Sequence, residues 1–330
     1  MSQPLRGVIV GTGSYAPAKV LSNADLMKLV DTSDEWIVQR TGVRERRMVG
    51  EGETPSTMGI AAAKNALENA GMTADQIDLI ICGTISPDMI FPATACLIQH
   101  GLGLSEIPAF DISAACSGFI YALTVADGMI ASGRYRNVLV VASDALTRFT
   151  DYSDRGSCIL FGDGAGAVVL QPTDDPQRGL KYSHIGARGS GWDFIHVPAG
   201  GSRIVASAQT VAAKQHYIQM RGREVYKFAV QQMVDLMAEG MAQCGLKVED
   251  IDLVVPHQVN QRIIESATSK LEFPLEKVFV NIDRYGNTSG ASIPLALDQA
   301  HRAGRTPPGA TLLLVAFGAG LTWGASVLKM

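Results

Sequence analysis

The sequence predicts an α/β fold in which helices cover both faces of the sheets. Short and nearly continuous apolar runs recur along the 330 residues, and longer segments with helical periodicity separate them. Strands buried on both faces have this continuous apolar character, because neither face meets water. The expected strands lie in 8–10, 79–82, 138–142, 167–170, 253–255, 278–280 and 312–316, and the main expected helices in 57–70, 118–132 and 224–243.

The two halves of the chain resemble each other. GMTADQIDLII at 71–81 is repeated as GLKVEDIDLVV at 245–255, an offset of 174 in the numbering. A Ser-Gly pair at 117 recurs at 289, an offset of 172, and the Gly-Arg pair that ends the following helix at 133 recurs at 304, an offset of 171. Such regular spacing indicates an ancient duplication.

The repeat predicts two similar halves, 1–172 and 173–330, with a boundary in the polar segment QPTDDPQRG at 171–179. By this spacing Cys116 and the Asn287-Thr288 pair stand at equivalent helix starts. Related halves meet along a central seam, so we expect side chains from both halves to converge there.

Composition excludes several classes of function. The net charge of −4 gives no electrostatic footprint for nucleic acid. No apolar run approaches the ~20 residues that span a bilayer, and the N-terminus has no signal-peptide pattern. The five cysteines are scattered and contain no C-x-x-C pair, so neither a disulfide framework nor a zinc site is expected. We expect a reduced, cytoplasmic protein without a metal.

Cys116 is the first candidate for catalysis. It lies in FDISAACSGF at 110–119, where an expected strand ends in small residues and an apolar helix begins. Backbone N–H groups and the positive end of the dipole at a helix N-terminus favour a thiolate, so we expect its pKa to lie below the usual ~8.5. The same N–H groups can hold an oxyanion. Local sequence alone leaves a packing role equally open.

Two polar segments in the second half are further candidates. His257 follows a buried strand and a proline in DLVVPHQVNQR at 252–262, at the end of a strand where α/β sheets place ligands. Asn287 lies in YGNTSGASIP at 285–294, which by itself is ordinary cap and turn chemistry. Only the expected symmetry with Cys116 makes Asn287 a candidate.

Two glycine-rich segments fail as nucleotide sites. GTGSYA at 11–16 follows a strand, but Pro17 prevents the helix that would receive a pyrophosphate. FGDGAGA at 161–167 has no Lys-Ser/Thr and leads into a strand. We expect tight turns at both places. By contrast, Trp36 among the four arginines of 32–47 suits a ligand that carries a base and phosphates, such as coenzyme A.

Three ordered motifs resemble the β-ketoacyl-acyl carrier protein synthase III family: Cys116 in AACSGF, His257 in HQVNQR and Asn287 in GNTSGAS. The resemblance runs nearly end to end and includes FGDGAGA and the C-terminal FGAGLTWG. It implies a thiolase-like fold of five layers, αβαβα, and a homodimer. It also implies that Cys116 accepts a short acyl group from acyl-CoA and passes it to malonyl-acyl carrier protein, while His257 and Asn287 stabilise the enolate that decarboxylation produces. No cofactor is implied, since acyl-CoA is a substrate.

The resemblance assigns further residues to binding. Trp36 and Arg155 match a pair that sandwiches the coenzyme A adenine, and Phe91 matches a residue that reaches into the acyl pocket of the partner subunit. Gly318 is expected to complete the hole for the Cys116-bound carbonyl. The other coenzyme-channel positions are Thr32, Arg40 and Asn260, and the carrier-protein positions are Gln258, Val259, Asn260, Gln261, Arg262, Lys227 and Lys270.

Other activities remain as alternatives. A related condensing enzyme of secondary metabolism, with a longer or branched primer, has the same residue types. A degradative thiolase would need a second cysteine, which the C-terminal loop FGAGLTWG lacks. A non-catalytic acyl-binding subunit would have no need of the three catalytic types. A cysteine hydrolase could use Cys, His and Asn, but it needs no coenzyme segment.

Overall fold

Two sheets form the frame of the protein. The computed structural model describes residues 5–330. One sheet has the strand order β1-β7-β6-β4-β5 and the other β11-β12-β13-β8. Their bounds are β1 Arg6–Tyr15, β4 Leu79–Gly83, β5 Ala109–Ile112, β6 Val138–Ala145, β7 Asp163–Thr173, β8 Gly179–Ala187, β11 Leu253–Pro256, β12 Thr311–Gly318 and β13 Thr322–Lys329.

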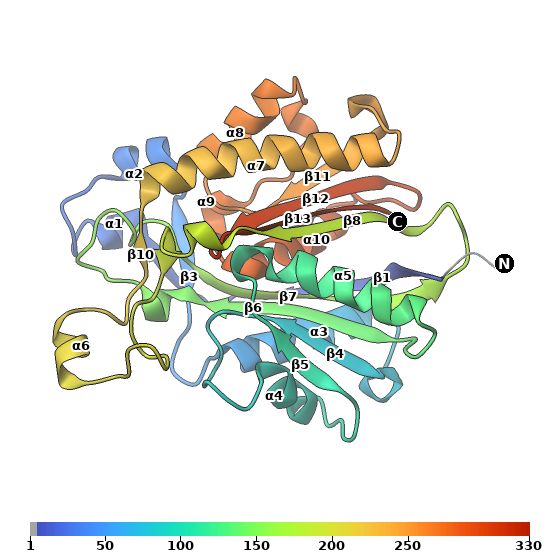
Figure 1. Ribbon diagram of the computed structural model, residues 1–330, viewed down its shortest axis with the longest axis horizontal. Helices are drawn as coiled ribbons and strands as arrows, with labels where there is room; N and C mark the ends of the chain where they lie inside the picture. The colour runs from blue at the N-terminus through green and yellow to red at the C-terminus, as the bar shows by residue number, and fades with distance from the viewer. Residues whose placement is uncertain (1–4) are drawn as a thin grey trace.

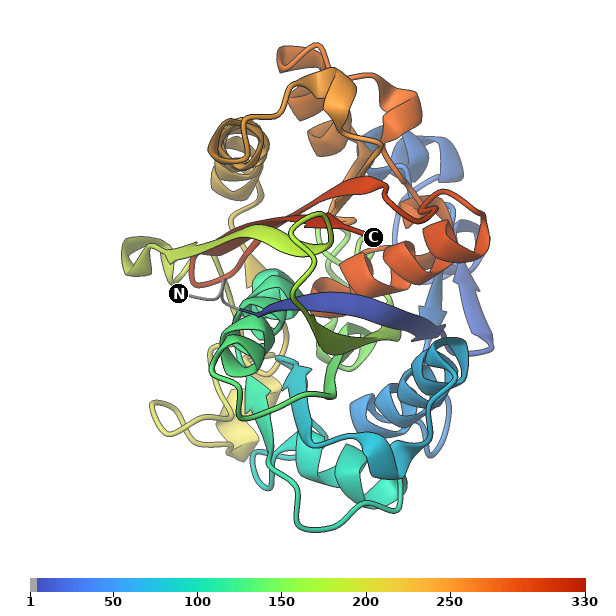
Figure 2. The same cartoon turned by 90° about the vertical axis from the view of Figure 1, so that its right-hand side faces the viewer.

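Helices cover these sheets in three layers (Figure 1). The outer layers are α3 (Pro55–Ala70) with α4 (Thr94–Gly101), and α7 (Gly222–Gln243) with α8 (Gln261–Lys270). Between the sheets lie α5 (Gly118–Ala131) and α10 (Ser292–Arg302), as the turned view of Figure 2 also shows. An apolar core fills each of the interfaces between layers. The five-layered αβαβα fold expected from the sequence is therefore confirmed.

The two sheets repeat one topology. In the first, β4 runs parallel to β6, β6 antiparallel to β7, and β7 antiparallel to β1. In the second, β11, β12, β13 and β8 follow the same pattern. The counterpart of β5 is reduced to a single parallel bridge between Val254 and Val278, so the strand expected at 278–280 does not form.

The two halves align differently from the alignment expected from the sequence repeat. Short 3₁₀ helices, Ala115–Ser117 (η2) and Ser289–Ala291 (η7), precede α5 and α10, and both pairs of elements start at an offset of 174. The matched Ser-Gly pairs at an offset of 172 are therefore not equivalent. Cys116 corresponds to Gly290 rather than to Asn287-Thr288. Because α5 has 14 residues and α10 has 11, the offset falls to 171 only at the helix ends.

The glycines of 11–16 lie inside β1, so the prediction of a tight turn there is wrong. A Cβ on Gly13 would lie 2.2 Å from the backbone nitrogen of Ala66, and glycine is required because α3 packs directly on this strand. In FGDGAGA the strand β7 begins at Asp163, so most of this segment is also extended.

Smaller elements surround the two sheets. Near the N-terminus they are α1 (Asn23–Leu26), α2 (Asp34–Thr41) and the antiparallel pair of β2 (Lys19–Ser22) and β3 (Glu45–Met48). Residues 188–221 form a flap that contains β9 (Ile195–His196), α6 (Ala208–Ala212) and β10 (Gln219–Met220), and α9 (Ile282–Tyr285) precedes η7. Within residues 5–330, none of the helices has the length and apolar character needed to cross a membrane.

Candidate active site

Cys116 lies in a tight turn at the N-terminus of the buried helix α5. The residue before it, Ala115, has a φ of 47°, in the left-handed region. The end of β12 passes so close that a Cβ on Gly318 would lie 2.8 Å from the Cys116 nitrogen and 3.0 Å from its Cβ. Glycine at 318 therefore lets the two backbones touch, which places both near any carbonyl bound to the thiol.

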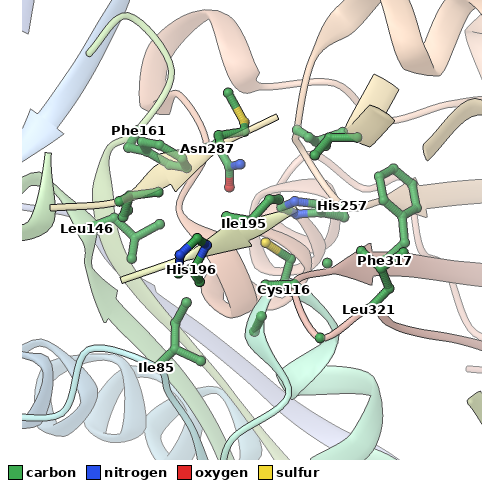
Figure 3. A pocket seen from close by; sticks show the side chains of 18 of the residues that line it. Ile85, Cys116, Leu146, Phe161, Ile195, His196, His257, Asn287, Phe317 and Leu321 are labelled. Atoms are coloured by element: carbon green, nitrogen blue, oxygen red, sulfur yellow. The ribbon is translucent and has the colours of Figure 1, made fainter. Parts of the chain in front are cut away.

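One cavity of about 390 Å³ contains Cys116, His257 and Asn287 in its lining. Figure 3 shows their side chains around it, with apolar residues on the surrounding walls. The three residues come from the starts and ends of elements in both halves, so the convergence expected at the central seam is observed. The apolar lining includes Ile85, Leu146, Leu160, Phe161, Ile195, Ile218, Met220, Phe317 and Leu321.

Backbone contacts between the halves fix Asn287. Its N–H donates to the Leu160 carbonyl at 2.8 Å, and its own carbonyl accepts from the Gly162 N–H at 3.0 Å. The side-chain Oδ1 accepts from the Ser289 N–H at 2.8 Å. Because Oδ1 is engaged, the orientation of the amide is set and its Nδ2 is the group left to donate hydrogen bonds.

His257 follows the end of β11 and lines the cavity. Its backbone N–H donates to the Val315 carbonyl at 2.8 Å, and its Nδ1 lies 2.6 Å from Ser292 Oγ. The ring of Phe317 packs edge-on against the imidazole, with 5.9 Å between centroids. Nε2 is buried and has no hydrogen-bond partner among the described residues. Burial lowers the pKa of His257 to about 3, so its ring is neutral at physiological pH.

The resting Cys116 is a thiol. Burial raises its pKa to about 12, although part of the residue is accessible from the cavity. The expectation of a pKa below the usual value is therefore wrong. Desolvation disfavours the thiolate, so a proton must leave the sulfur as the acyl group is transferred.

The expected adenine pair lies outside the cavity lining. The guanidinium carbons of Arg155 and Arg40 lie 4.9 Å and 5.0 Å from the centre of the Trp36 ring. Arg155 also donates to the Asp31 carbonyl at 3.0 Å. Because Arg155 touches Trp36 directly, an aromatic base can enter between them only after Arg155 moves.

Thr32 and Asn260, the two other expected coenzyme positions, differ in which of their hydrogen-bonding groups are already engaged. Thr32 Oγ1 lacks a hydrogen-bond partner among the described residues, but it is buried, so a ligand reaches it only after a local movement. Asn260 caps α8, since its Oδ1 accepts from the Arg262 N–H at 2.9 Å. Its Nδ2 donates to the Arg40 carbonyl at 2.9 Å. Asn260 therefore ties α8 to α2 and retains one N–H for a ligand.

The expected carrier-protein segment divides into buried and exposed residues. Gln258 is only 1% exposed, and its amide bonds the Pro256 and Phe279 carbonyls and the Asn281 N–H. The assignment of Gln258 to a docking surface is therefore wrong, because its buried side chain holds the loop after β11 in place. Val259 lines the cavity instead. Gln261 donates to Glu265 at 2.8 Å on α8. The cations Arg262, Lys227 and Lys270 are exposed.

Phe91 is 82% exposed and does not line the cavity of its own protomer. The neighbouring Ile90 is 81% exposed. Both belong to the loop between β4 and α4, so the chain carries an apolar projection there.

Several residues around the cavity were missed from the sequence. The flap contributes Trp192, His196 and Val197, and it has no periodicity that could have indicated its position. Asp144 is fully buried and accepts from the Gly290 N–H at 3.2 Å and from Ser86 Oγ at 2.8 Å, which anchors η7. Phe317 and Ser292 stand inside motifs that were recognised, but neither residue type indicated its contact with His257.

Comparison with known proteins identifies the family. The family model described as 3-oxoacyl-[acyl-carrier-protein] synthase III matches residues 110–189. The model for the C-terminal part of the same family matches residues 241–330. A β-ketoacyl-[acyl-carrier-protein] synthase III from Caldanaerobacter subterraneus subsp. tengcongensis is 48% identical over 329 residues, covering 100% of this chain and 99% of that protein. One from a Roseiflexus species is 52% identical over 321 residues, covering 97% of each. This chain belongs to the β-ketoacyl-[acyl-carrier-protein] synthase III family.

Solved structures of such synthases agree with the fold. The 3-oxoacyl-[acyl-carrier-protein] synthase III of Aquifex aeolicus is 47% identical and superimposes with a TM-score of 0.90 over 98% of this chain and 100% of that one. The priming β-ketosynthase of the R1128 polyketide pathway is 37% identical, with a TM-score of 0.91 over 100% and 98%. This synthase is therefore a thiolase-like acyltransferase of fatty-acid synthesis, as the resemblance implied.

Proposed function

We propose that this synthase condenses a short acyl group from acyl-CoA with malonyl-acyl carrier protein, and that Cys116 carries the acyl group between the two half-reactions. The observation that supports this most is the presence of Cys116, His257 and Asn287 in one largely apolar cavity. A thioester on cysteine remains an acyl donor, so the energy of the acyl-CoA bond is kept for the condensation.

In the first half-reaction, Cys116 Sγ bonds to the acyl carbon and the bond to the coenzyme sulfur breaks. The thiol proton ends on the released coenzyme. The Cys116 N–H and the backbone at Gly318 face the carbonyl that gains negative charge, and each hydrogen bond to such an oxyanion can contribute about 3–4 kcal/mol. The close contact of these two backbones supports this assignment.

In the second half-reaction, malonyl-acyl carrier protein loses CO₂ and its α-carbon attacks the acyl group on Cys116. The enolate oxygen forms beside His257 Nε2 and Asn287 Nδ2. Both groups are neutral donors, so they stabilise the enolate without protonating its carbon. The lowered pKa of His257 supports this role, since an imidazolium would be a stronger acid. The released Cys116 thiolate then takes up one proton from solvent.

Groups outside the cavity are suited to binding coenzyme A and the acyl carrier protein. Trp36 with Arg155 stacks on the adenine once Arg155 has moved aside, and Thr32 and Arg40 bind along the same route. Arg262, Lys227 and Lys270 are exposed cations on α7 and α8. An acidic carrier protein would dock on this local patch although the enzyme itself is acidic.

The working enzyme is a homodimer in this proposal. Ile90 and Phe91 form a contiguous exposed apolar pair, and such a pair is suited to contact with another protein surface. Insertion of Phe91 into the acyl pocket of the partner subunit would cover it and would limit the length of the acyl group.

The division between the half-reactions is tested by assaying them separately. We expect Asn287→Ala and His257→Ala to form the acyl-enzyme at rates within about threefold of the wild type. Each should lose roughly 10²–10³-fold in decarboxylation of malonyl-acyl carrier protein, because each removes one enolate donor. Equal losses in both half-reactions would contradict the proposal.

A second function, priming of a polyketide, is favoured by one observation, the 37% identity to the R1128 priming ketosynthase. The two functions differ in the primer. Competition among acetyl-, butyryl- and hexanoyl-CoA for Cys116 distinguishes them, since preference for acetyl supports the initiation of fatty-acid synthesis and preference for a longer group supports the second function.

A further inference from the structure

The position of one proton decides what His257 can do. A neutral imidazole carries a single N–H, either on Nδ1 or on Nε2. Only a proton on Nε2 lets His257 donate to a substrate oxygen in the cavity, because Nδ1 is occupied by its hydrogen bond with Ser292 Oγ. Some contact must therefore select one of the two tautomers.

The hydrogen bonds at Ser292 make that selection. Ser292 Oγ lies 2.6 Å from His257 Nδ1 and accepts from the Gln258 N–H at 3.3 Å. It has no further partner among the described residues, and Ser292 is 2% exposed. If Nδ1 carried the proton, the hydroxyl would accept two N–H groups while its own hydrogen had no acceptor. A buried donor without a partner is costly, so this arrangement is disfavoured.

The opposite arrangement satisfies every group. The Gln258 N–H donates to Oγ, the Ser292 O–H donates to Nδ1, and the imidazole proton sits on Nε2. The Gln258 backbone is held in place because its side chain is bonded at three points. Nε2 is then the one ring atom left unpaired, and it belongs to a residue that lines the cavity.

We propose that Ser292 is a positioning residue of the condensation step: its hydroxyl donates to His257 Nδ1 and thereby keeps the Nε2–H directed at the enolate oxygen. This inference rests on the proposed function, in which His257 donates to that oxygen. Ser292 itself touches no substrate. The acyl transfer to Cys116 does not depend on it.

The tautomer can be observed directly in the wild-type enzyme. With ¹⁵N-labelled histidine, the His257 resonances are identified by their loss in His257→Gln. We expect Nε2 in the free enzyme to have the chemical shift of a protonated ring nitrogen and Nδ1 that of an unprotonated one. The reverse assignment, or an imidazolium, would overturn the proposal without any need for a Ser292 variant.

Kinetics provide the second test. Ser292→Ala should lose roughly 10²–10³-fold in condensation, the loss expected when one oxyanion donor is misdirected. Its acylation by acetyl-CoA should stay near that of the wild type, and Ser292→Thr should recover most of the condensation. Ser326→Ala removes another fully buried hydroxyl, outside the cavity lining, and is the matched control. Wild-type condensation in Ser292→Ala, or an equal loss of acylation, would overturn the role.

The two proposals fail in different ways. A wild-type enzyme that forms no acyl-Cys116 with any acyl-CoA would refute the proposed function, and with it the role of Ser292. A wild-type enzyme that acylates normally, but holds its proton on Nδ1, would refute the role of Ser292 alone.

Discussion

Ala115 and Ser289 occupy equivalent positions in the two halves, and both have a left-handed backbone, with φ of 47° and 52°. Each is the first residue of the short 3₁₀ helix that precedes a buried central helix. The turn at Ala115 directs Cys116 into the cavity, whereas the turn at Ser289 receives the amide oxygen of Asn287. The same bend thus occurs in both halves and serves two different parts of the site.

The bend at Ala115 should tolerate glycine and reject a branched side chain. We expect the free energy of unfolding of Ala115→Gly to stay within about 1 kcal/mol of the wild type, since relief of strain offsets the entropy of glycine. Ala115→Val should lose roughly 1–3 kcal/mol more, because a β-branched residue fits poorly at this φ. Urea titration measures both. In Ala131→Val, at the end of α5, the loss should be smaller, and an equal loss would show that the bend is not the cause.

Gly318→Ala should impair acyl transfer more than stability. Its Cβ would lie 2.8 Å from the Cys116 nitrogen, so the turn that carries the thiol must move. A displacement of about 1 Å can cost about 10²-fold in rate, and we expect a fall of this order in acyl-enzyme formation. Gly128→Ala in α5 is the control, because no atom lies within 4 Å of the added Cβ. Normal acylation by Gly318→Ala would argue against backbone contact at the oxyanion.

Alkylation of Cys116 by iodoacetamide should rise about tenfold per pH unit from pH 7 to 10. The raised thiol pKa of about 12 means that the thiolate fraction keeps increasing throughout this range. Intact mass at short reaction times follows the modification, with Cys116→Ala to subtract other cysteines. A plateau near pH 7–8 would instead indicate a thiolate stabilised by the helix terminus.

Acid should destabilise the enzyme partly through His257. Its pKa is about 3 in the folded state against an ordinary value of 6.5, so the unfolded chain binds the additional proton between these values. The contribution of the neutral ring to the free energy of unfolding is fully present above pH 6.5. Below that pH it falls by about 1.4 kcal/mol per pH unit. His257→Gln should therefore lose less stability than the wild type between pH 6.5 and 4.5. Parallel curves for the two proteins would contradict a depressed pKa.

Substitutions at Gln258 and Arg262 should have different effects, the first on stability and the second on binding of the carrier protein. Arg262→Glu should raise the KM for malonyl-acyl carrier protein about tenfold or more and leave acylation by acyl-CoA unchanged, because the cation is exposed. Gln258→Ala should lower the free energy of unfolding by about 1–3 kcal/mol, since three buried backbone groups lose partners. Similar effects of both variants on KM would place Gln258 in the docking surface after all.

The fold could be predicted from the sequence because its signals are local and repeated. Apolar runs and the repeated segment at 71–81 and 245–255 indicated the layers and the seam, and motif resemblance indicated the three residues that line the cavity. Contacts that depend on exact backbone placement could not be predicted. The register between Cys116 and Gly290 needed the helix starts, since α10 is shorter than α5.

Burial accounts for the other differences. Gln258 has the residue type of a surface loop, and only its three buried hydrogen bonds show that it is structural. Cys116 lies at a helix N-terminus, as expected, but the sequence does not reveal that burial raises the pKa of its thiol. The pairing of Ser292 with His257 joins residues 35 positions apart, for which no local pattern exists.

Intact mass after incubation with acetyl-CoA shows whether Cys116 carries the acyl group. We expect a mass increase of one acetyl group on the wild-type chain, located on Cys116 by peptide analysis and lost when malonyl-acyl carrier protein is added. The same increase should be absent from Cys116→Ala. A wild-type enzyme that condenses its substrates without this adduct, or a Cys116→Ala variant that still forms it, would rule out Cys116 as the acyl carrier.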